Sequence, residues 1–299
     1  MRAGVRLVAQ AAVLLLATLL LRGLLRVLRA LGRSLLPQAA ARFGALVASQ
    51  SPAYWLLFAA SMCLCTTLSV WLARRFIDRR SFASLGVVRD GDTGRDLCLG
   101  VLVAALIQSA LFGVEWAAGW LHVAGFGWSA QPIAQVLPSV AAIGLVFATV
   151  AWYEELLARG YWLLNMSEGL NRPLAVLLSS SAFALGHIGN PNVTWVAIVA
   201  LLGPGLLFAW AVIRTGRLWL AIGLHFGWNL FEGSVFGFPV SGLATVTLIQ
   251  TTVDGPTLWT GGEFGPEAGL VVLPALAAGA FAIGLATRGR AVRSRAAVD

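Results

Sequence analysis

Long apolar runs separated by short polar segments dominate this chain. A transmembrane helix needs about 20 mostly apolar residues, and the pattern predicts about eight such spans. They are expected at 7–21, 53–73, 97–121, from Pro132 onward, from Pro173 to His187, and at 193–213, 217–236 and 267–287. We therefore predict an all-α fold, a polytopic membrane helix bundle with about eight transmembrane helices.

Local breaks divide these runs. Arg22, Arg26, Arg29 and Arg33 recur at helical spacing, which predicts a basic interfacial helix over 22–36, ended by Pro37. Elsewhere Gly, Pro, Asn and Asp mark connections. These are expected as a polar loop at 89–96, a turn at Gly125–Gln131, a break at 189–192, a kink at 203–205 and a loop over 237–265.

Composition supports the membrane class. The chain is 59% hydrophobic and 11% charged, whereas soluble domains have about 45–50% apolar and about 25% charged residues. The net charge of +8 comes from arginine alone. Arginine gathers in alternate loops, which indicates cytoplasmic N- and C-termini beside anionic lipid and argues against nucleic-acid binding. The lack of lysine suggests a GC-rich bacterial genome, so we expect the bacterial inner (cell) membrane.

Charged residues inside an apolar run are costly and are usually kept for a function. Glu154, Glu155 and Arg159 lie in the run that begins near Ile133. His187 lies in a second run, and His225 with Asn229 in another. We assume that the fourth helix continues to about residue 168. A rise of 1.5 Å per residue then puts Glu155, His187, His225 and Asn229 roughly 12–20 Å from the cytoplasmic boundary of the membrane core. They would then share one zone of the membrane core.

The spacing within each segment indicates separate roles. Adjacent helical residues point about 100° apart, and Arg159 is four residues after Glu155, the spacing of an ion pair on one face. That leaves Glu154 to face the bundle. A carboxylate in an apolar cavity can take up and return a proton near neutral pH. His187 would orient a water molecule beside it.

His225 and Asn229 also share one helix face, where their N–H groups could stabilise an oxyanion. A general base, an oriented water and oxyanion donors together predict a hydrolase of an acyl bond, most simply a peptide bond. Glu232 follows on a similar face and is a candidate for a supporting role.

Other interpretations remain open at this point. A membrane Glu–Arg pair or a lone histidine often serves packing alone. A proton-coupled transporter would use Glu154 and His187 as a relay, although the internal repeats common in transporters are missing. A non-catalytic membrane protein that binds a peptide, for instance an immunity protein, is the third alternative.

Three motifs resemble those of a known family. They are Glu-Glu-x-x-x-Arg at 154–159, Phe-x-x-x-His at 183–187 and His-x-x-x-Asn at 225–229. In this order they are similar to the motifs of the CPBP family, which includes type II CAAX prenyl proteases and the bacteriocin-processing or immunity enzymes called Abi. The resemblance covers roughly 80–270 and includes the stretches at 84–87 and 236–242.

The resemblance implies an integral-membrane endopeptidase. By it, Glu154 is the catalytic base, His187 helps to activate water, and His225 with Asn229 forms the oxyanion site. Glu155 and Arg159 are structural. The chain would divide into N-terminal helices with a basic segment at 1–79, the protease domain at 80–288 and a basic tail at 289–299.

The cofactor and the substrate are less defined. We favour a glutamate mechanism without a metal, because the chain has no His-Glu-x-x-His pair. The alternative is zinc held by Glu154, His187 and His225, a combination that zinc accepts. The expected partners are the lipid bilayer and a peptide or protein substrate, for which a C-terminal segment, prenylated or not, is a candidate.

Overall fold

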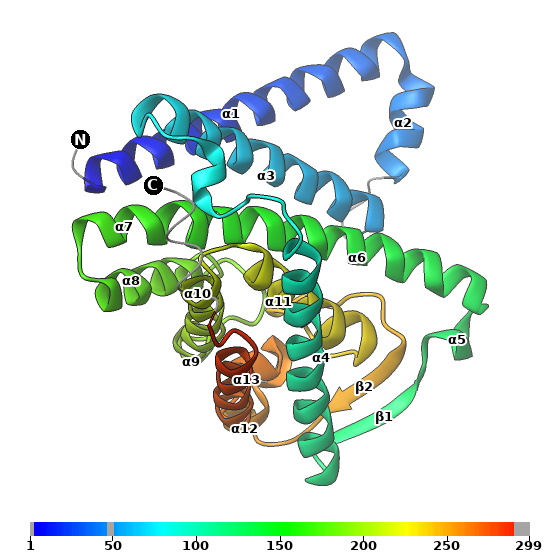
Figure 1. Ribbon diagram of the computed structural model, residues 1–299. Helices are drawn as coiled ribbons and strands as arrows, with labels where there is room; N and C mark the ends of the chain where they lie inside the picture. The colour runs from blue at the N-terminus through cyan, green and yellow to red at the C-terminus, as the bar shows by residue number, and fades with distance from the viewer. Residues whose placement is uncertain (1–2, 47–50, 290–299) are drawn as a thin grey trace.

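A computed structural model describes residues 3–46 and 51–289 (Figure 1). Arg2 and the basic tail from residue 290 lie outside these ranges, so what we expect of them is not tested. The longer helices are α1 (Ala3–Leu35), α2 (Pro37–Leu46), α3 (Pro52–Leu72), α4 (Thr93–Ala117), α6 (Ile133–Glu155), α8 (Arg172–Leu185), α10 (Leu202–Thr215), α11 (Trp219–Asn229) and α13 (Val272–Ala286). The shorter elements are α5 (Gly127–Ala130), α7 (Leu163–Gly169), α9 (Trp195–Ala200), α12 (Thr257–Thr260), β1 (Leu121–Phe126) and β2 (Ile249–Val253).

Five helical stretches of the described chain are long and apolar enough to cross a membrane. They are Ala3–Leu35, Pro52–Ile77, Thr93–Ala117, Ile133–Gly169 and Trp195–Thr215. Two further apolar helices, α8 and α13, are shorter. The protein is thus a helical membrane protein, as the hydrophobic pattern predicts, but the expected count of about eight spans is not confirmed.

The first helix is longer than expected. Residues 22–35 do not form a separate interfacial helix, because α1 runs without a break for 33 residues. Nothing in this stretch stops a helix before Pro37, which cannot continue one and instead opens α2. The fourth span does continue beyond its charged residues, as the depth argument requires, since α6 passes through a π-helical turn into α7.

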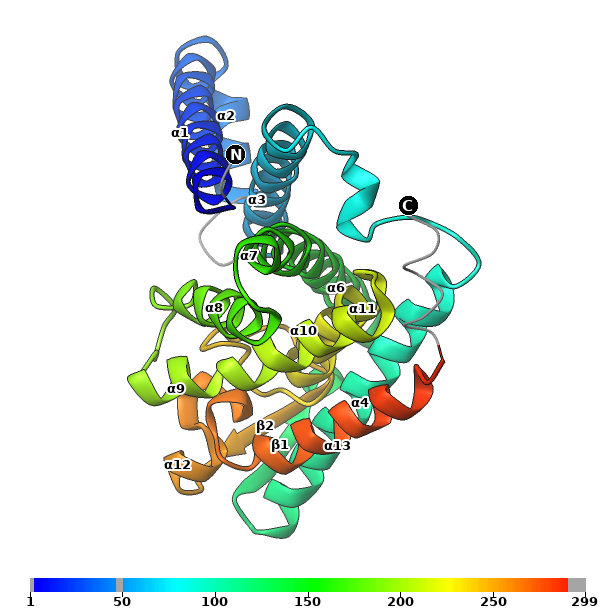
Figure 2. The same ribbon diagram turned by 60° about the vertical axis from the view of Figure 1, so that its left-hand side comes forward.

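The long α6–α7 rod divides the molecule. In both views α1 and α3 lie on one side of it, and α8, α10, α11, α4 and α13 lie on the other (Figures 1 and 2). The rod therefore presents side chains to both halves of the bundle.

A small antiparallel sheet departs from the all-α expectation. β1 pairs with β2 from Leu121 opposite Val253 to Phe126 opposite Ile249, with a bulge between Val123 and Gly125. The turn expected at Gly125–Gln131 therefore contains the end of a strand and the short helix α5. β2 is rich in β-branched residues, which favour strands, but its partner lies more than a hundred residues away, so no local pattern shows the pairing.

Close packing of α4 against α11 fixes the face that α11 turns to the rod. A Cβ on Gly223 would lie 2.3 Å from the Leu97 backbone oxygen, and one on Gly227 would lie 2.9 Å from the Val101 Cα. Glycines four residues apart let two membrane helices approach closely. His225 lies midway between them, about 200° around the helix from Gly223, and so points away from α4.

Candidate active site

The polar pair Glu154–Glu155 lies where the α6–α7 rod changes from α-helical to π-helical geometry. α6 ends at Glu155, and the next residues, Leu156–Trp162, form a π-helical turn. Another π turn, Leu230–Val235, begins directly after Asn229, and a further one, Ala73–Ile77, carries none of the candidate residues. Such turns are rare and concentrate at functional sites. The turns after Glu155 and Asn229 therefore mark the two segments that carry most of the polar residues singled out from the sequence.

Glu155 and Arg159 form the ion pair that their spacing predicts. The Arg159 guanidinium donates to Glu155 Oε1 at 2.9 Å, and both side chains are fully buried. Arg159 also donates to the Gly205 carbonyl oxygen at 3.0 Å. Its Cζ lies over the rings of Phe183, at 4.3 Å, and Phe208, at 5.3 Å. The guanidinium thus ties the rod to α8 and α10.

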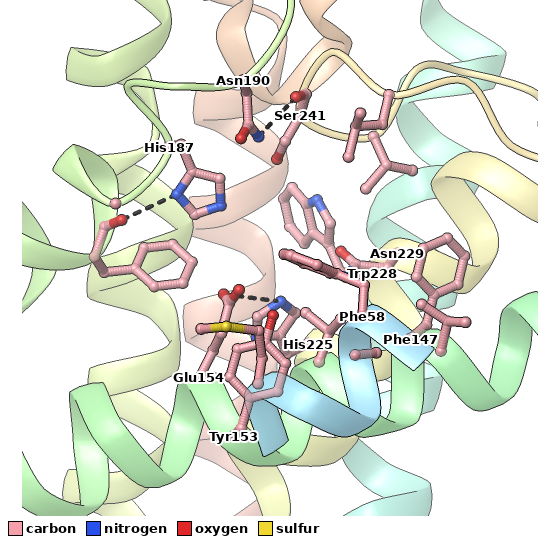
Figure 3. Close-up of a pocket in the computed structure, with 18 of the residues that line it drawn as sticks. Phe58, Phe147, Tyr153, Glu154, His187, Asn190, His225, Trp228, Asn229 and Ser241 are labelled. Carbon is pink, nitrogen blue, oxygen red and sulfur yellow. Dashed lines mark hydrogen bonds and ion pairs between the residues drawn. The ribbon is translucent and has the colours of Figure 1, made fainter. Parts of the chain in front are cut away.

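Glu155 also holds His225, a contact that spacing alone does not show. His225 Nδ1 lies 2.9 Å from Glu155 Oε1, and its ring stacks on Phe208 with centroids 5.0 Å apart. Because a carboxylate accepts, Nδ1 carries the proton. The other nitrogen, Nε2, lies 3.9 Å from Glu154 Oε2. Glu155 and Glu154 therefore face the two nitrogens of the His225 ring, Nδ1 and Nε2 respectively. Figure 3 shows the contact with Glu154.

His187 is oriented by its own local turn. α8 ends at Leu185, two residues earlier than expected, and His187 lies in the turn that follows. Its Nδ1 lies 3.0 Å from the Phe183 carbonyl oxygen. A carbonyl oxygen only accepts, so Nδ1 carries the proton and Nε2 of the neutral ring keeps a lone pair. The ring projects toward the cavity (Figure 3).

The four residues singled out as catalytic candidates line one cavity. Its volume is about 590 Å³, and its lining includes Glu154, His187, His225 and Asn229. Ligand pockets have volumes of about 300–1,000 Å³. No described residue hydrogen-bonds the side-chain amide of Asn229, which leaves its N–H groups for a ligand. Much of the remaining wall is apolar and comes from α3 and α6, with Leu14 from α1.

Several cavity residues are not singled out by the sequence pattern. Trp228, Asn190, Ser241 and Glu267 also line it. Asn190 belongs to the predicted break after His187, and Ser241 to the 236–242 stretch that carries part of the family resemblance. Those two signals could have pointed to them, whereas Glu267 lies outside every motif.

Glu232, the candidate for a supporting role, is fully buried in the π turn Leu230–Val235 and does not line the cavity. Its carboxylate lies beside the Trp228 side chain and the backbone of Glu267. His122 lies far from these groups in the chain and on β1, where its exposed ring is 3.4 Å from Asp254.

The residues named for zinc do not gather as a metal site. Within the described ranges no three His, Cys, Asp or Glu side chains come close enough together to hold a metal ion. His225 donates through Nδ1 to Glu155, as zinc-bound imidazoles also do, and its Nε2 is 3.9 Å from Glu154 Oε2; two ligands of one tetrahedral zinc ion lie about 3.3–3.6 Å apart. The zinc alternative with Glu154, His187 and His225 therefore stays a prediction, which a chelator tests.

Comparison with protein families identifies the segment that builds most of this site. Residues 135–231 match the model described as type II CAAX prenyl endopeptidase, Rce1-like. The matched segment begins in α6 and ends just past Asn229, so it holds all three motifs. No curated protein and no solved structure matches the chain.

Proposed function

We propose that this chain, whose residues 135–231 match the Rce1-like family of type II CAAX prenyl endopeptidases, is an integral-membrane endopeptidase that hydrolyses a peptide bond. The observation that carries the proposal is the shared cavity. Glu154, His187, His225 and Asn229 come from separate segments of the chain and line the same space. A base, a water-orienting imidazole and side-chain donors are the groups that acyl hydrolysis needs.

In the proposed mechanism Glu154 is the general base. It takes a proton from a water molecule while the water oxygen attacks the carbonyl carbon of the scissile bond. The Nε2 lone pair of His187 accepts a hydrogen bond from the same water and orients it. Glu154 then returns the proton to the amide nitrogen as the C–N bond breaks, which leaves a carboxylic acid and an amine.

Asn229 and His225 stabilise the negative charge on the carbonyl oxygen. Asn229 supports this role because its amide has no other partner among the described residues. His225 donates through Nε2 when its ring carries both protons, one of them directed at Glu155. Glu155 is thus a positioning residue for His225, and Arg159 holds Glu155 in place.

The substrate is a peptide or protein segment that reaches the cavity from the bilayer. The family description supports a C-terminal segment, prenylated or not, and the apolar wall from α3 supports an apolar chain beside it. We place the protein in a bacterial inner membrane with both termini cytoplasmic. The mechanism uses no metal ion.

Cleavage of a peptide library by the purified protein in detergent tests the proposal. Wild type, Glu154→Gln and the control Glu263→Gln are compared, each with and without a chelator; Glu263 is exposed and lies outside the cavity. We expect Glu154→Gln alone to abolish cleavage, and the chelator to have no effect. Equal cleavage by Glu154→Gln and wild type would remove Glu154 from the mechanism, and loss with the chelator would establish a metal site.

A library that no variant cleaves would favour the non-catalytic binding protein instead. Proton uptake coupled to solute flux in liposomes, abolished by Glu154→Gln, would favour the transporter.

A further inference from the structure

A third carboxylate, Glu267, lines the cavity on the wall that the proposed mechanism does not use. It is 4% exposed and belongs to the short turn before α13. Trp228 donates its indole N–H to Glu267 Oε2 at 3.2 Å, and the Ser241 hydroxyl donates to Oε1. Ser241 in turn accepts from the Asn190 side chain at 2.9 Å through its carbonyl oxygen. Figure 3 shows Asn190 and Ser241 across the cavity from Glu154.

Among the described residues Glu267 has no arginine to balance it, and the groups nearby that can carry a positive charge are the imidazoles of His187 and His225. No arginine lines the cavity, although the chain carries a net charge of +8. Within the described ranges no ion pair involves Glu267, whereas Glu155 has Arg159 and His225. Both hydrogen bonds to Glu267 come from neutral donors. A buried carboxylate that no opposite charge pairs costs several kcal/mol, so a cation that enters the cavity would recover part of that cost.

We propose that Glu267 is a specificity-determining residue that receives a cationic side chain of the substrate, lysine or arginine, near the scissile bond. The inference rests on the proposed endopeptidase function. Glu154 is reserved for the proton transfer, which leaves Glu267 as the cavity's remaining acidic group. A cavity of about 590 Å³ has room for the residues on both sides of the cleaved bond.

The hydrogen bonds of Glu267 to Trp228 and Ser241 could also be purely structural, as a link between two segments that we call the clamp. Glu267 joins α11, through Trp228, to the loop that holds Ser241. Glutamine at this position can keep both links, because its carbonyl oxygen accepts from Trp228 and its NH₂ group donates to the Ser241 hydroxyl. Glu267→Gln therefore removes the charge and spares the clamp, and Glu267→Asp keeps the charge.

The test uses peptide pairs that differ only by lysine or norleucine, with the lysine moved one position at a time along a cleaved sequence. The readout is the ratio of kcat/KM for the lysine peptide to that for the norleucine peptide. We expect wild type to prefer lysine about 10-fold at one position, the equivalent of about 1.4 kcal/mol. The ratio should fall to about 1 in Glu267→Gln, persist in part in Glu267→Asp, and remain at its wild-type value in the control Glu263→Gln.

Binding of the same pairs to Glu154→Gln separates this proposal from the proposed function. A lysine preference in binding without any cleavage by wild type would keep the subsite and refute the peptidase. A wild type without a lysine preference in either assay would overturn the subsite, whatever the variants do. So would a Glu267→Gln variant that loses activity but keeps the lysine-to-norleucine ratio, because that result assigns Glu267 to the clamp alone.

Discussion

Replacement of Arg159 by methionine tests whether the buried ion pair holds the site together. Methionine keeps an apolar stem between Phe183 and Phe208 but removes the charge. Glu155 would remain fully buried without its guanidinium partner, and loss of one member of a buried pair costs about 3–5 kcal/mol. The Gly205 carbonyl oxygen would also lose its donor. We expect the free energy of unfolding to fall by about 3–5 kcal/mol.

Reversible unfolding in mixed SDS and detergent micelles, followed by tryptophan fluorescence, measures this loss. The double variant Glu155→Gln/Arg159→Met has no buried charge at the pair and should recover most of the stability. The control Arg29→Met changes an exposed residue of α1 and should stay within about 0.5 kcal/mol of wild type.

Two results would refute the reasoning on Arg159. A loss below about 1 kcal/mol in Arg159→Met is the value of a solvated pair and would mean that water reaches it. A double variant no more stable than Arg159→Met would mean that the uncompensated charge of Glu155 is not what destabilises the single variant.

Two further predictions concern helix packing and the oxyanion site. Gly223→Ala puts a Cβ 2.3 Å from the Leu97 oxygen and should destabilise the protein by about 1–3 kcal/mol. The control is Gly113→Ala on α4, where an added Cβ has no atom within 4 Å; it should be neutral or stabilise the protein by up to about 1 kcal/mol. If both variants changed the free energy of unfolding equally, the close packing of Gly223 would be contradicted. Asn229→Ala should lower kcat about 10²–10³-fold with little change in KM, and a change in KM alone would assign Asn229 to substrate binding.

Much of the fold follows from the order of residues along the chain. Apolar runs define the membrane helices because each side chain in a bilayer must suit its apolar surroundings. The start of α8 is also local, since Asn171 caps it and a proline stands in its first turn. Where a local stop signal is missing, prediction from the pattern is less certain, and the division of α1 into two helices is wrong for that reason.

In the candidate site, too, some contacts follow from local spacing and others from tertiary packing. The Glu155–Arg159 pair is determined by the sequence, because residues four apart on one helix meet wherever that helix packs. The bond between Glu155 and His225 joins residues 70 apart in the chain. It depends on how α11 is rotated against the rod, and that rotation is set by the contact of Gly223 and Gly227 with α4.

The sequence alone therefore determined the membrane class, the approximate extent of most helices and which polar residues stand within them, since all of these depend on neighbours along one helix. Only the tertiary structure decided which polar residues meet. The cavity, the β1–β2 pairing and the position of Glu267 beside Trp228 and Ser241 each join segments far apart in the chain. Contacts of this kind follow from the packing of whole elements, which periodicity within a single segment does not encode.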